Sequence, residues 1–368
     1  RAPEPPRASA CRGILRCTQG TGACAREVAL KPLATAPVTT RILDGFDDPT
    51  LGRFRWNALV DKSDTRVGYL TWEFQRAWWE TIGWGELRLI AAQRDGATVA
   101  LAPFYVGSGI VFFVGASVEV DYLDFIGDVS DPAVLHALLK EARDSVPDFT
   151  GFDLEFIPDS SRTPKLLAES SAGLGLWCEQ DYEMLATGID LVGHREAVLA
   201  SVNAKSMLRP ERWFTRHGSL QVRHLRNGEE ILPHLGQFFA QHRARYHTRD
   251  NPSRLFSEKV CGLFERLTVL AAKTGWLRFT RIDWDGRPIA FHYGHCYAGR
   301  YFWGTASFAP EVARRSPGKL LLRHLLLAAM EEGACVFDFG TGQQPFKLRL
   351  GTGAARVRSW WLGRDEPA

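Results

Sequence analysis

The chain has 368 residues, of which 45% are hydrophobic and 24% charged, with a formal net charge of +3. This balance predicts a globular protein long enough for two domains, and the small positive charge gives no support for nucleic-acid binding by itself. No apolar run reaches the roughly 18–20 residues of a membrane span. The seven cysteines include no C-x-x-C pair, which argues against a zinc site and favours reduced thiols in a cytoplasmic protein.

Residues 1–38 begin with RAPEPPRASA and show no sustained hydrophobic period. They lack the apolar core of a secretory signal, so we expect a disordered N-terminal tail outside the fold.

An internal repeat follows this tail. GELRLIAAQRDGATVAL (85–101) and GWLRFTRIDWDGRPIAF (275–291) align without a gap at an offset of 190 residues, and six positions are identical. The identities include Asp95-Gly96 and Asp285-Gly286. Each copy is typical of a strand, an Asp-Gly turn and a second strand, which is the strongest short hairpin signal.

Each hairpin is followed by a helix and a strand. In the first half, Asp131 is the expected N-cap of the helix that begins at Pro132, and GFDLEFI (151–157) is the next strand. In the second half a helix opens at Pro317-Gly318, ends at Gly333 and leads into ACVFDFG (334–340). The same order in both halves indicates a duplication.

Two helices are expected before the second hairpin. Residues 229–247 place Ile231, Phe238 and Tyr246 on one helical face. Ser257 then precedes a second periodic segment that ends before Gly275.

The second half therefore has an order of elements that resembles the GNAT acyltransferase fold. In that family Gln/Arg-x-x-Gly-x-Gly/Ala is a loop whose backbone N–H groups bind the pyrophosphate of coenzyme A. Residues 315–320 (RSPGKL) match Arg-x-x-Gly but place Leu320 at the last small position. A glycine at a helix N-terminus lets the backbone approach a phosphate, and the helix dipole favours the anion. The resemblance implies an acyl-CoA co-substrate bound by Gly304, Thr305, Arg315, Ser316, Gly318 and Lys319.

Two tandem copies with S-P-G-x-L-L and a final D-F-x-x-G-x-x-x-(Y/F)-K resemble more closely the CelD-like acetyltransferases linked to cellulose and other exopolysaccharide synthesis. Fem-type aminoacyl transferases have a similar duplicated architecture. The matching segments are YLTWEFQRAWW (69–79), VALAPFY (99–105), VDYLDFIG (120–127) and FFAQHRARYH (238–247).

The resemblance covers about residues 42–362 and implies an α/β fold of two tandem GNAT-like domains, each a mixed, mostly antiparallel sheet flanked by helices. Residues 39–190 are then a degenerate domain on the acceptor side, because their helix starts Ser-Asp-Pro and lacks the Arg-x-x-Gly loop. Residues 191–368 are the acyl-CoA-binding, catalytic domain.

Acyl transfer to an amine needs a base, a donor for the oxyanion and an acid for the leaving thiolate. Asp338 lies mid-strand between aromatic residues, where a raised pKa suits a base; its twin Asp153 favours a structural role instead. His292 either faces the cleft or is a satisfied, half-buried histidine.

The segment FDFGTGQQPFKLRLG (337–351) fits neither the P-loop nor the dinucleotide-binding template. We expect it to be the last core strand and a loop that closes the cleft. Lys347 would then point an ammonium group at an anion or a developing oxyanion, or lie solvated on the surface.

The acceptor side is predicted by resemblance at Asp121, Tyr122 and Asp124, with Tyr246 from the second half. Strand alternation would put Tyr122 and Asp124 on one polar face and Asp121 on the other. Four further cations share one face of a helix, if that helix tolerates Pro210: Lys205, Arg209, Arg212 and Arg216.

The predicted function is direct acyl transfer from acyl-CoA to a small amine acceptor, such as an amino sugar or sugar nucleotide, without metal or DNA. A Fem-type transferase that uses aminoacyl-tRNA is one alternative. The other is a non-catalytic duplicated scaffold, which Leu320 and Phe346, where Tyr is common, would suit.

Overall fold

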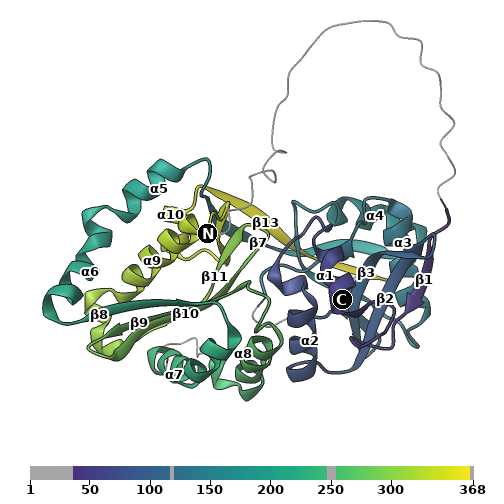
Figure 1. Cartoon of the computed structure of the whole chain (residues 1–368). Helices are drawn as coiled ribbons and strands as arrows, with labels where there is room; N and C mark the ends of the chain where they lie inside the picture. Colours follow the sequence, from purple (N-terminus) through teal and green to yellow (C-terminus); the bar gives the residue numbers. More distant parts are fainter. Residues whose placement is uncertain (1–35, 117–119, 247–253, 365–368) are drawn as a thin grey trace, which may run out of the picture. The chain divides into compact units, whose positions relative to one another are not determined.

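The computed structural model describes residues 36–116, 120–246 and 254–364 (Figure 1). The expectation of a disordered tail falls on residues that lie outside this part, up to residue 35. None of the helices in the described ranges is long and apolar enough to cross a membrane.

The first repeat is a sheet of strands with helices between them. Its elements are β1 (Thr39–Ile42), α1 (Gly52–Val60), η1 (Gly68–Leu70), α2 (Trp72–Thr81), β2 (Glu86–Arg94), β3 (Ala97–Gly107), β4 (Ile110–Phe113), β5 (Ile126–Gly127), α3 (Pro132–Asp144), β6 (Gly151–Pro158), α4 (Thr163–Gly173) and β7 (Trp177–Asp190).

The second repeat follows the same order after two linking helices, α5 (Arg195–Val202) and α6 (Lys205–His217). Its elements are β8 (Leu220–Leu225), α7 (Gly228–Tyr246), η2 (Arg254–Phe256), α8 (Glu258–Leu270), β9 (Leu277–Trp284), β10 (Arg287–Tyr297), β11 (Arg300–Phe308), η3 (Pro310–Arg315), α9 (Pro317–Glu331), β12 (Val336–Thr341), α10 (Pro345–Leu350) and β13 (Gly353–Gly363). The bounds of β10 are those of β3 moved by 190 residues, so the predicted duplication is confirmed as a feature of the fold.

The turns of both repeated hairpins have the predicted conformation. Asp95 and Gly96 have φ values of 51° and 76°, and Asp285 and Gly286 have 49° and 74°. Two successive residues with positive φ form the tight turn that matches the right-handed twist of the flanking strands.

The helices after the two hairpins begin differently. At α3 the side chain of Asp131 accepts a hydrogen bond from the backbone N–H of Ala133, so the helix start carries its own carboxylate. At α9 the residue before the helix, Ser316, makes no side-chain cap and has a φ of 59°. In the first turn of α9 Pro317 has no N–H, and the N–H groups of Lys319 and Leu320 donate to the carbonyl of Ser316. The N–H of Gly318 is therefore the group of this turn that no acidic cap among the described residues occupies.

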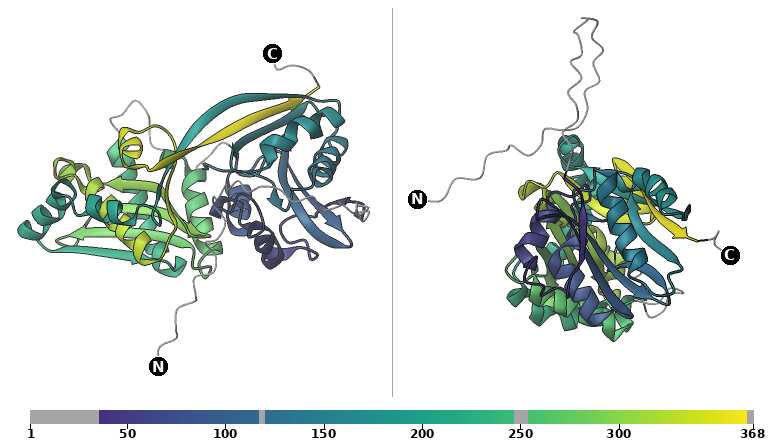
Figure 2. Two further views of the ribbon diagram at one scale, coloured as in Figure 1. Left: turned by 90° about the horizontal axis from the view of Figure 1, so that it is seen from above. Right: turned by 90° about the vertical axis from the view of Figure 1, so that its right-hand side faces the viewer.

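All strands join one mixed sheet in which the repeats exchange their last strands. The order is β1-β2-β3-β4-β6-β13-β7-β12-β11-β10-β9-β8, with β5 on β3. Strand β13 of the second repeat pairs with β6 of the first, and β7 pairs with β12. Figure 2 shows β7 and β13 side by side between the repeats. Neither repeat can complete its sheet without a strand of the other.

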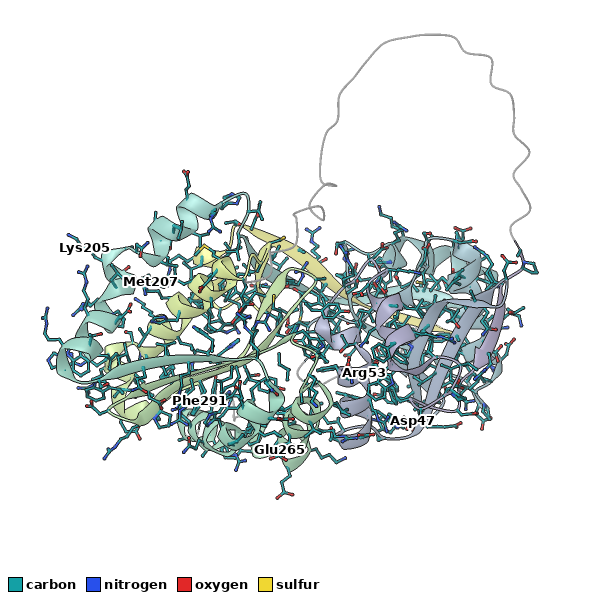
Figure 3. All side chains as sticks on the ribbon, viewed as in Figure 1. Asp47, Arg53, Lys205, Met207, Glu265 and Phe291 are labelled. Carbon is teal, nitrogen blue, oxygen red and sulfur yellow. The ribbon has the colours of Figure 1, made fainter. Side chains whose placement is uncertain are left out.

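The core of the second repeat lies on both faces of its sheet. On one face Phe291 packs with Phe238 of α7, and on the other the leucines of α9 pack with Met207 of α6. Figure 3 shows Lys205 on the outer side of α6 and Met207 on the side that faces α9. Helix α6 contains Pro210 without ending there, and the four predicted cations are all exposed.

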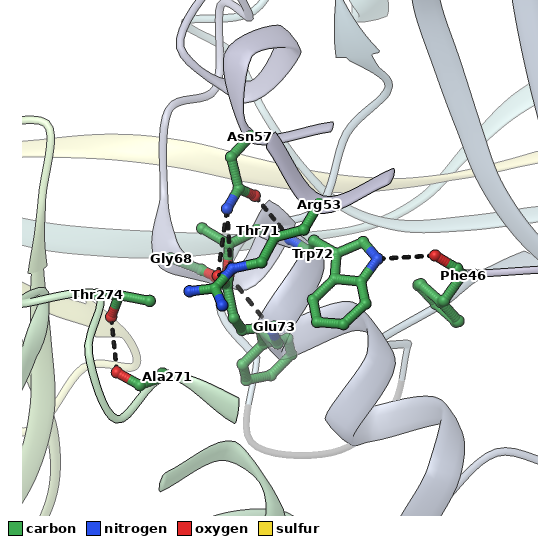
Figure 4. A network of polar contacts seen from close by, with 10 residues as sticks. Phe46, Arg53, Asn57, Gly68, Thr71, Trp72, Glu73, Ala271 and Thr274 are labelled. Atoms are coloured by element: carbon green, nitrogen blue, oxygen red, sulfur yellow. Dashed lines mark hydrogen bonds and ion pairs between the residues drawn. The ribbon is translucent and has the colours of Figure 1, made fainter. Parts of the chain in front are cut away.

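The helical layer of the first repeat is fixed by a buried acid. Glu73 of α2 has an exposed side-chain fraction of 0% and forms an ion pair with Arg53 of α1. Asn57 donates to the same carboxylate at 3.0 Å and accepts from the backbone of Trp72 (Figure 4). These contacts hold α1 against the start of α2, which in turn packs against α8 of the second repeat.

Candidate functional site

The two parallel strands β11 and β12 separate shortly after they meet. They pair only from Arg300 to Phe302 and from Val336 to Asp338. Beyond that point β11 bulges against β10, and Gly304 in the bulge has a φ of 51°. A Cβ at Gly304 would lie 2.2 Å from the carbonyl oxygen of Tyr293, so only glycine fits this bulge.

An inter-repeat cavity of about 770 Å³ lies on one side of this opening. Both repeats line it, and aromatic side chains dominate its wall. Of the predicted site residues it contains Asp121, Tyr246, Gly304, Thr305 and Lys347.

A second cavity, here called the α9 cavity, has a volume of about 670 Å³. It is bounded by the start of α9 at Gly318 and Lys319, by β11, by α10 and by the first turn of α6. Its described lining includes three cations, Arg245, Lys319 and Arg349, and no acidic side chain. This charge pattern and the uncapped helix start suit a ligand with several negative charges.

The two cavities meet at four residues that line both of them: Arg245, Trp303, Ala306 and Phe346. Arg245 donates to the carbonyl of Ala306 at 2.9 Å, and its guanidinium carbon lies 3.9 Å from the centre of the Phe308 ring. None of the three large side chains at this junction was predicted as a site residue, since the residues that form it lie about 40 to 100 positions apart in the sequence.

The carboxylate of Asp338 is held by three groups and lines neither cavity. It accepts from both the hydroxyl of Tyr122, at 3.0 Å to each oxygen, and the backbone N–H of Gly340 at 2.7 Å. Arg300 completes the set as an ion pair. The carboxylate thus fixes the turn that follows β12 and ties it to the first repeat.

Asp121 does reach the inter-repeat cavity. Its carboxylate accepts from the backbone N–H of Thr341 at 2.6 Å and from the hydroxyl of Tyr69 at 3.3 Å. Burial raises the pKa of Asp121, although the hydrogen bonds from Thr341 and the charge of Lys347 act in the opposite direction. A carboxylate with a raised pKa in a cavity wall can bind an ammonium ion and accept its proton.

Lys347 lies at the same end of the cavity. Its ammonium group donates to the carbonyl of Thr341 at 2.6 Å, and the residue is 7% exposed. Burial lowers the pKa of Lys347, and the nearby charges of Asp121 and Asp338 partly oppose this. Asp121, Thr341 and Lys347 therefore form one polar group made by both repeats.

Two histidines of β10 lie near the junction. His292 is fully buried, and its ring centre is 5.9 Å from that of Trp303. His295 lines the inter-repeat cavity and stacks on Phe302 at 4.8 Å. Burial lowers the pKa of each ring to about 3, so both are neutral at physiological pH.

The expected grouping of Tyr122 with Asp124 is wrong, because residues 121–125 do not form a strand. Tyr122 binds Asp338, whereas the carboxylate of Asp124 binds Thr65 at 2.7 Å and Thr163 at 2.6 Å. Without strand alternation the segment directs each polar side chain to a different partner.

Two residues predicted to bind the co-substrate lie outside the described walls of both cavities. Arg315 is exposed, with its guanidinium carbon 4.3 Å from the centre of the Trp213 ring of α6, and Ser316 precedes α9. The predicted set is thus split, with Gly318 and Lys319 in the α9 cavity and Gly304 and Thr305 in the inter-repeat cavity.

Comparisons with known proteins agree with this architecture. Residues 202–348, from the end of α5 into α10, match the family model described as an acetyltransferase (GNAT) domain. The sequence has no match among curated proteins.

Among solved structures, FemX is similar with 12% identity and a TM-score of 0.58, over 84% of this chain and 95% of that one. A conserved protein of unknown function from Bacteroides thetaiotaomicron has 12% identity and a TM-score of 0.55, over 88% and 100%. The C-terminal domain of a putative lysylphosphatidylglycerol synthetase from Agrobacterium fabrum has 15% identity and a TM-score of 0.51, over 79% and 88%. The fold is therefore that of tandem GNAT-like domains.

Proposed function

We propose that this protein transfers an acyl group from acyl-CoA to an amine, with acyl-CoA in the α9 cavity and the amine in the inter-repeat cavity. The observation that carries the proposal is the start of α9, where Gly318 and Lys319 line a cavity without an acidic side chain among its described residues. In this proposal residues 39–190 serve the acceptor side and residues 191–368 hold the acyl donor.

The residues present fit an acyl-CoA. Phosphate groups of coenzyme A bind to backbone N–H donors and to cations, and the N–H of Gly318 with the side chains of Lys319 and Arg349 would offer both. The equivalent helix in the first repeat cannot offer the same site, because the carboxylate of Asp131 already occupies its start. Gly304 and Thr305 would hold the pantetheine arm through their backbone, as the family resemblance implies.

Acyl-CoA supplies the acyl group as a reactive thioester. We assign to Asp121 the role of binding the acceptor ammonium and removing its proton, because its carboxylate lines the cavity. Lys347 lies beside Asp121 and favours its ionised form, which burial alone would disfavour. Asp338 acts as a positioning residue that holds the turn before Thr341, and His292 packs against the ring of Trp303.

The inter-repeat cavity suits an amine whose remaining part can pack on aromatic rings. Its wall combines the carboxylate of Asp121 with the rings of Tyr69, Tyr182 and Tyr246. Aromatic faces also attract a cation, so they complement an ammonium group. We propose an amino sugar used in polysaccharide synthesis, in line with the CelD-like resemblance.

The test is a turnover assay with acetyl-CoA and a panel of amines: glucosamine, glucosamine 6-phosphate, UDP-glucosamine, lysine and spermidine. Release of the coenzyme A thiol and a product heavier by one acetyl group are expected with at least one amino sugar. Lys347→Met should lower kcat at least tenfold, whereas Lys165→Met, an exposed lysine of α4, should leave it unchanged. No acetylated product from any amine would count against the proposal.

An aminoacyl-tRNA-dependent transferase is the second candidate, favoured by the exposed cations along α6. Binding of tRNA that weakens steeply with salt, without binding of acetyl-CoA, would support it. The scaffold alternative loses one of its arguments, since Leu320 is fully buried in the core and lies outside the described wall of the α9 cavity.

A further inference from the structure

The junction between the two cavities has a partition made of aromatic side chains. Trp303 of β11 and Phe346 of α10 line both cavities, and their ring centres are 6.0 Å apart with planes tilted by 57°. Together with Arg245 and Ala306, these two rings form the junction that a group passing from the α9 cavity to the inter-repeat cavity would meet.

The two rings of the partition pack on neighbouring side chains, one of which, Phe339, also lines the inter-repeat cavity. Phe339 of β12 lies 6.1 Å from Trp303 and 5.7 Å from Phe346, measured between ring centres, and is 2% exposed. The imidazole of His292 packs on Trp303 from β10. Rings supported by buried neighbours on two other strands have little room to move aside for a ligand.

Geometry limits what the acyl group can be. If the donor lies in the α9 cavity and the amine in the inter-repeat cavity, the bond to be broken lies at the junction. The rest of the acyl chain then points past Trp303 and Phe346 into the space that the acceptor needs. A long acyl chain would therefore collide with the rings of Trp303 and Phe346, and any part of it that passed them would occupy the space of the acceptor.

We infer that Trp303 and Phe346 set the acyl-chain length, and that the donor carries a short acyl group such as acetyl. This inference rests on the proposed function, because it takes acyl-CoA to be the ligand of the α9 cavity.

The test is calorimetric titration of acetyl-, butyryl- and octanoyl-CoA into the full chain and its variants. In an open apolar path each added methylene would tighten binding roughly fourfold. We expect the wild type to show no such gain, with octanoyl-CoA binding at least tenfold more weakly than acetyl-CoA. Trp303→Ala and Phe346→Ala should reverse this order, so that butyryl-CoA binds roughly tenfold more tightly than acetyl-CoA.

Two further variants keep the test decisive. Phe346→Leu removes the ring with less change in volume and should shift the preference in the same direction if an alanine variant does not fold. Leu350→Ala, on the same helix but lining only the α9 cavity, should keep the wild-type order.

The outcomes separate the inference from the proposed function. A folded wild type that binds none of the three thioesters would remove both. A wild type that binds octanoyl-CoA as tightly as acetyl-CoA would overturn the chain-length inference alone. The inference would equally fail if the Trp303 and Phe346 variants kept the wild-type order.

Discussion

The hydroxyl of Tyr122 lies 3.0 Å from both carboxylate oxygens of Asp338, a residue 216 positions further along the chain. Tyr122 belongs to the first repeat and Asp338 to β12 of the second. The expectation that residues 337–351 are the last core strand and a loop is wrong, because α10 and the core strand β13 follow β12. Asp338 also accepts a hydrogen bond from the backbone N–H of Gly340, and the next residue, Thr341, donates to Asp121. Residues of both repeats therefore fix the polar end of the inter-repeat cavity.

Tyr122→Phe should destabilise the protein by about 2 kcal/mol, since it removes a hydrogen bond to a buried charged group. Urea unfolding measures this change. Turnover should fall as well, because the turn after β12 loses part of its support. Tyr297→Phe removes a hydroxyl bound to the exposed Asp61 and serves as the matched control, with a smaller expected loss. Equal stability of wild type and Tyr122→Phe would contradict the assigned role.

Asp121→Asn should lower kcat about a hundredfold or more, as expected for loss of a general base. The rate of the wild type should rise with pH through the pKa of Asp121. Because burial raises that pKa, the acidic limb should lie above the value of about 3.9 typical of aspartate. The measurement is the pH profile of kcat, and Asp128→Asn, an exposed carboxylate of the same repeat, is the control. An unchanged acidic limb in Asp121→Asn would assign the base elsewhere.

A substitution of Leu362 tests whether the exchanged strand β13 stabilises the first repeat. Leu362 lies on β13 of the second repeat but packs, fully buried, in the core shared with the first repeat. Leu362→Ala should cost about 3 kcal/mol of unfolding free energy, through lost burial and a cavity. Hydrogen exchange should show faster opening in β6, its partner strand, than in α9. Loss of protection confined to α9 would show that β13 stabilises only its own repeat.

Asp153 lies on β6, the strand of the first repeat that corresponds to the strand of Asp338. Its ionised carboxylate should lower the free energy of unfolding at neutral pH. Burial, followed by the charges of Glu155 and Asp181, raises its pKa to about 6. The folded state thus favours the protonated form, and this preference is lost as pH rises through about 6. Asp153→Asn should therefore be neutral below about pH 4 and stabilising by about 1 kcal/mol above pH 7, after discounting for solvent screening. Thermal unfolding at pH 4 and pH 8 checks the difference, and a gain that is larger at pH 4 would contradict it.

Local signals predicted much of the fold. The Asp-Gly turns, the Asp131 cap and the Pro317 helix start depend on a few neighbouring residues, and each appears in the structure as expected. The duplication followed from a constant offset between two hairpins, which needs no knowledge of tertiary structure.

The remaining features of the fold and of the site depend on which distant segments lie together in the folded chain. The exchange of β7 and β13 leaves no trace in either strand's own sequence, because both remain half-buried strands whichever neighbour they have. Asp338 and Asp121 both looked like acids near a cleft, yet only Asp121 lines a cavity. Residues such as Arg245 and Trp303 became candidates only when distant segments were brought to one junction.

The most direct test of the central claim is calorimetric titration of acetyl-CoA into wild type, Gly318→Trp and Gly318→Ala at one salt concentration. A Cβ at Gly318 would meet the ring of Phe308 at 3.5 Å, an ordinary contact, so alanine fits the fold and should weaken binding less than tryptophan does. The account predicts micromolar binding by wild type and Gly318→Ala, and none by Gly318→Trp, whose indole would fill the α9 cavity. A folded wild type that does not bind acetyl-CoA, or a Gly318→Trp variant that binds it unchanged, would contradict the account.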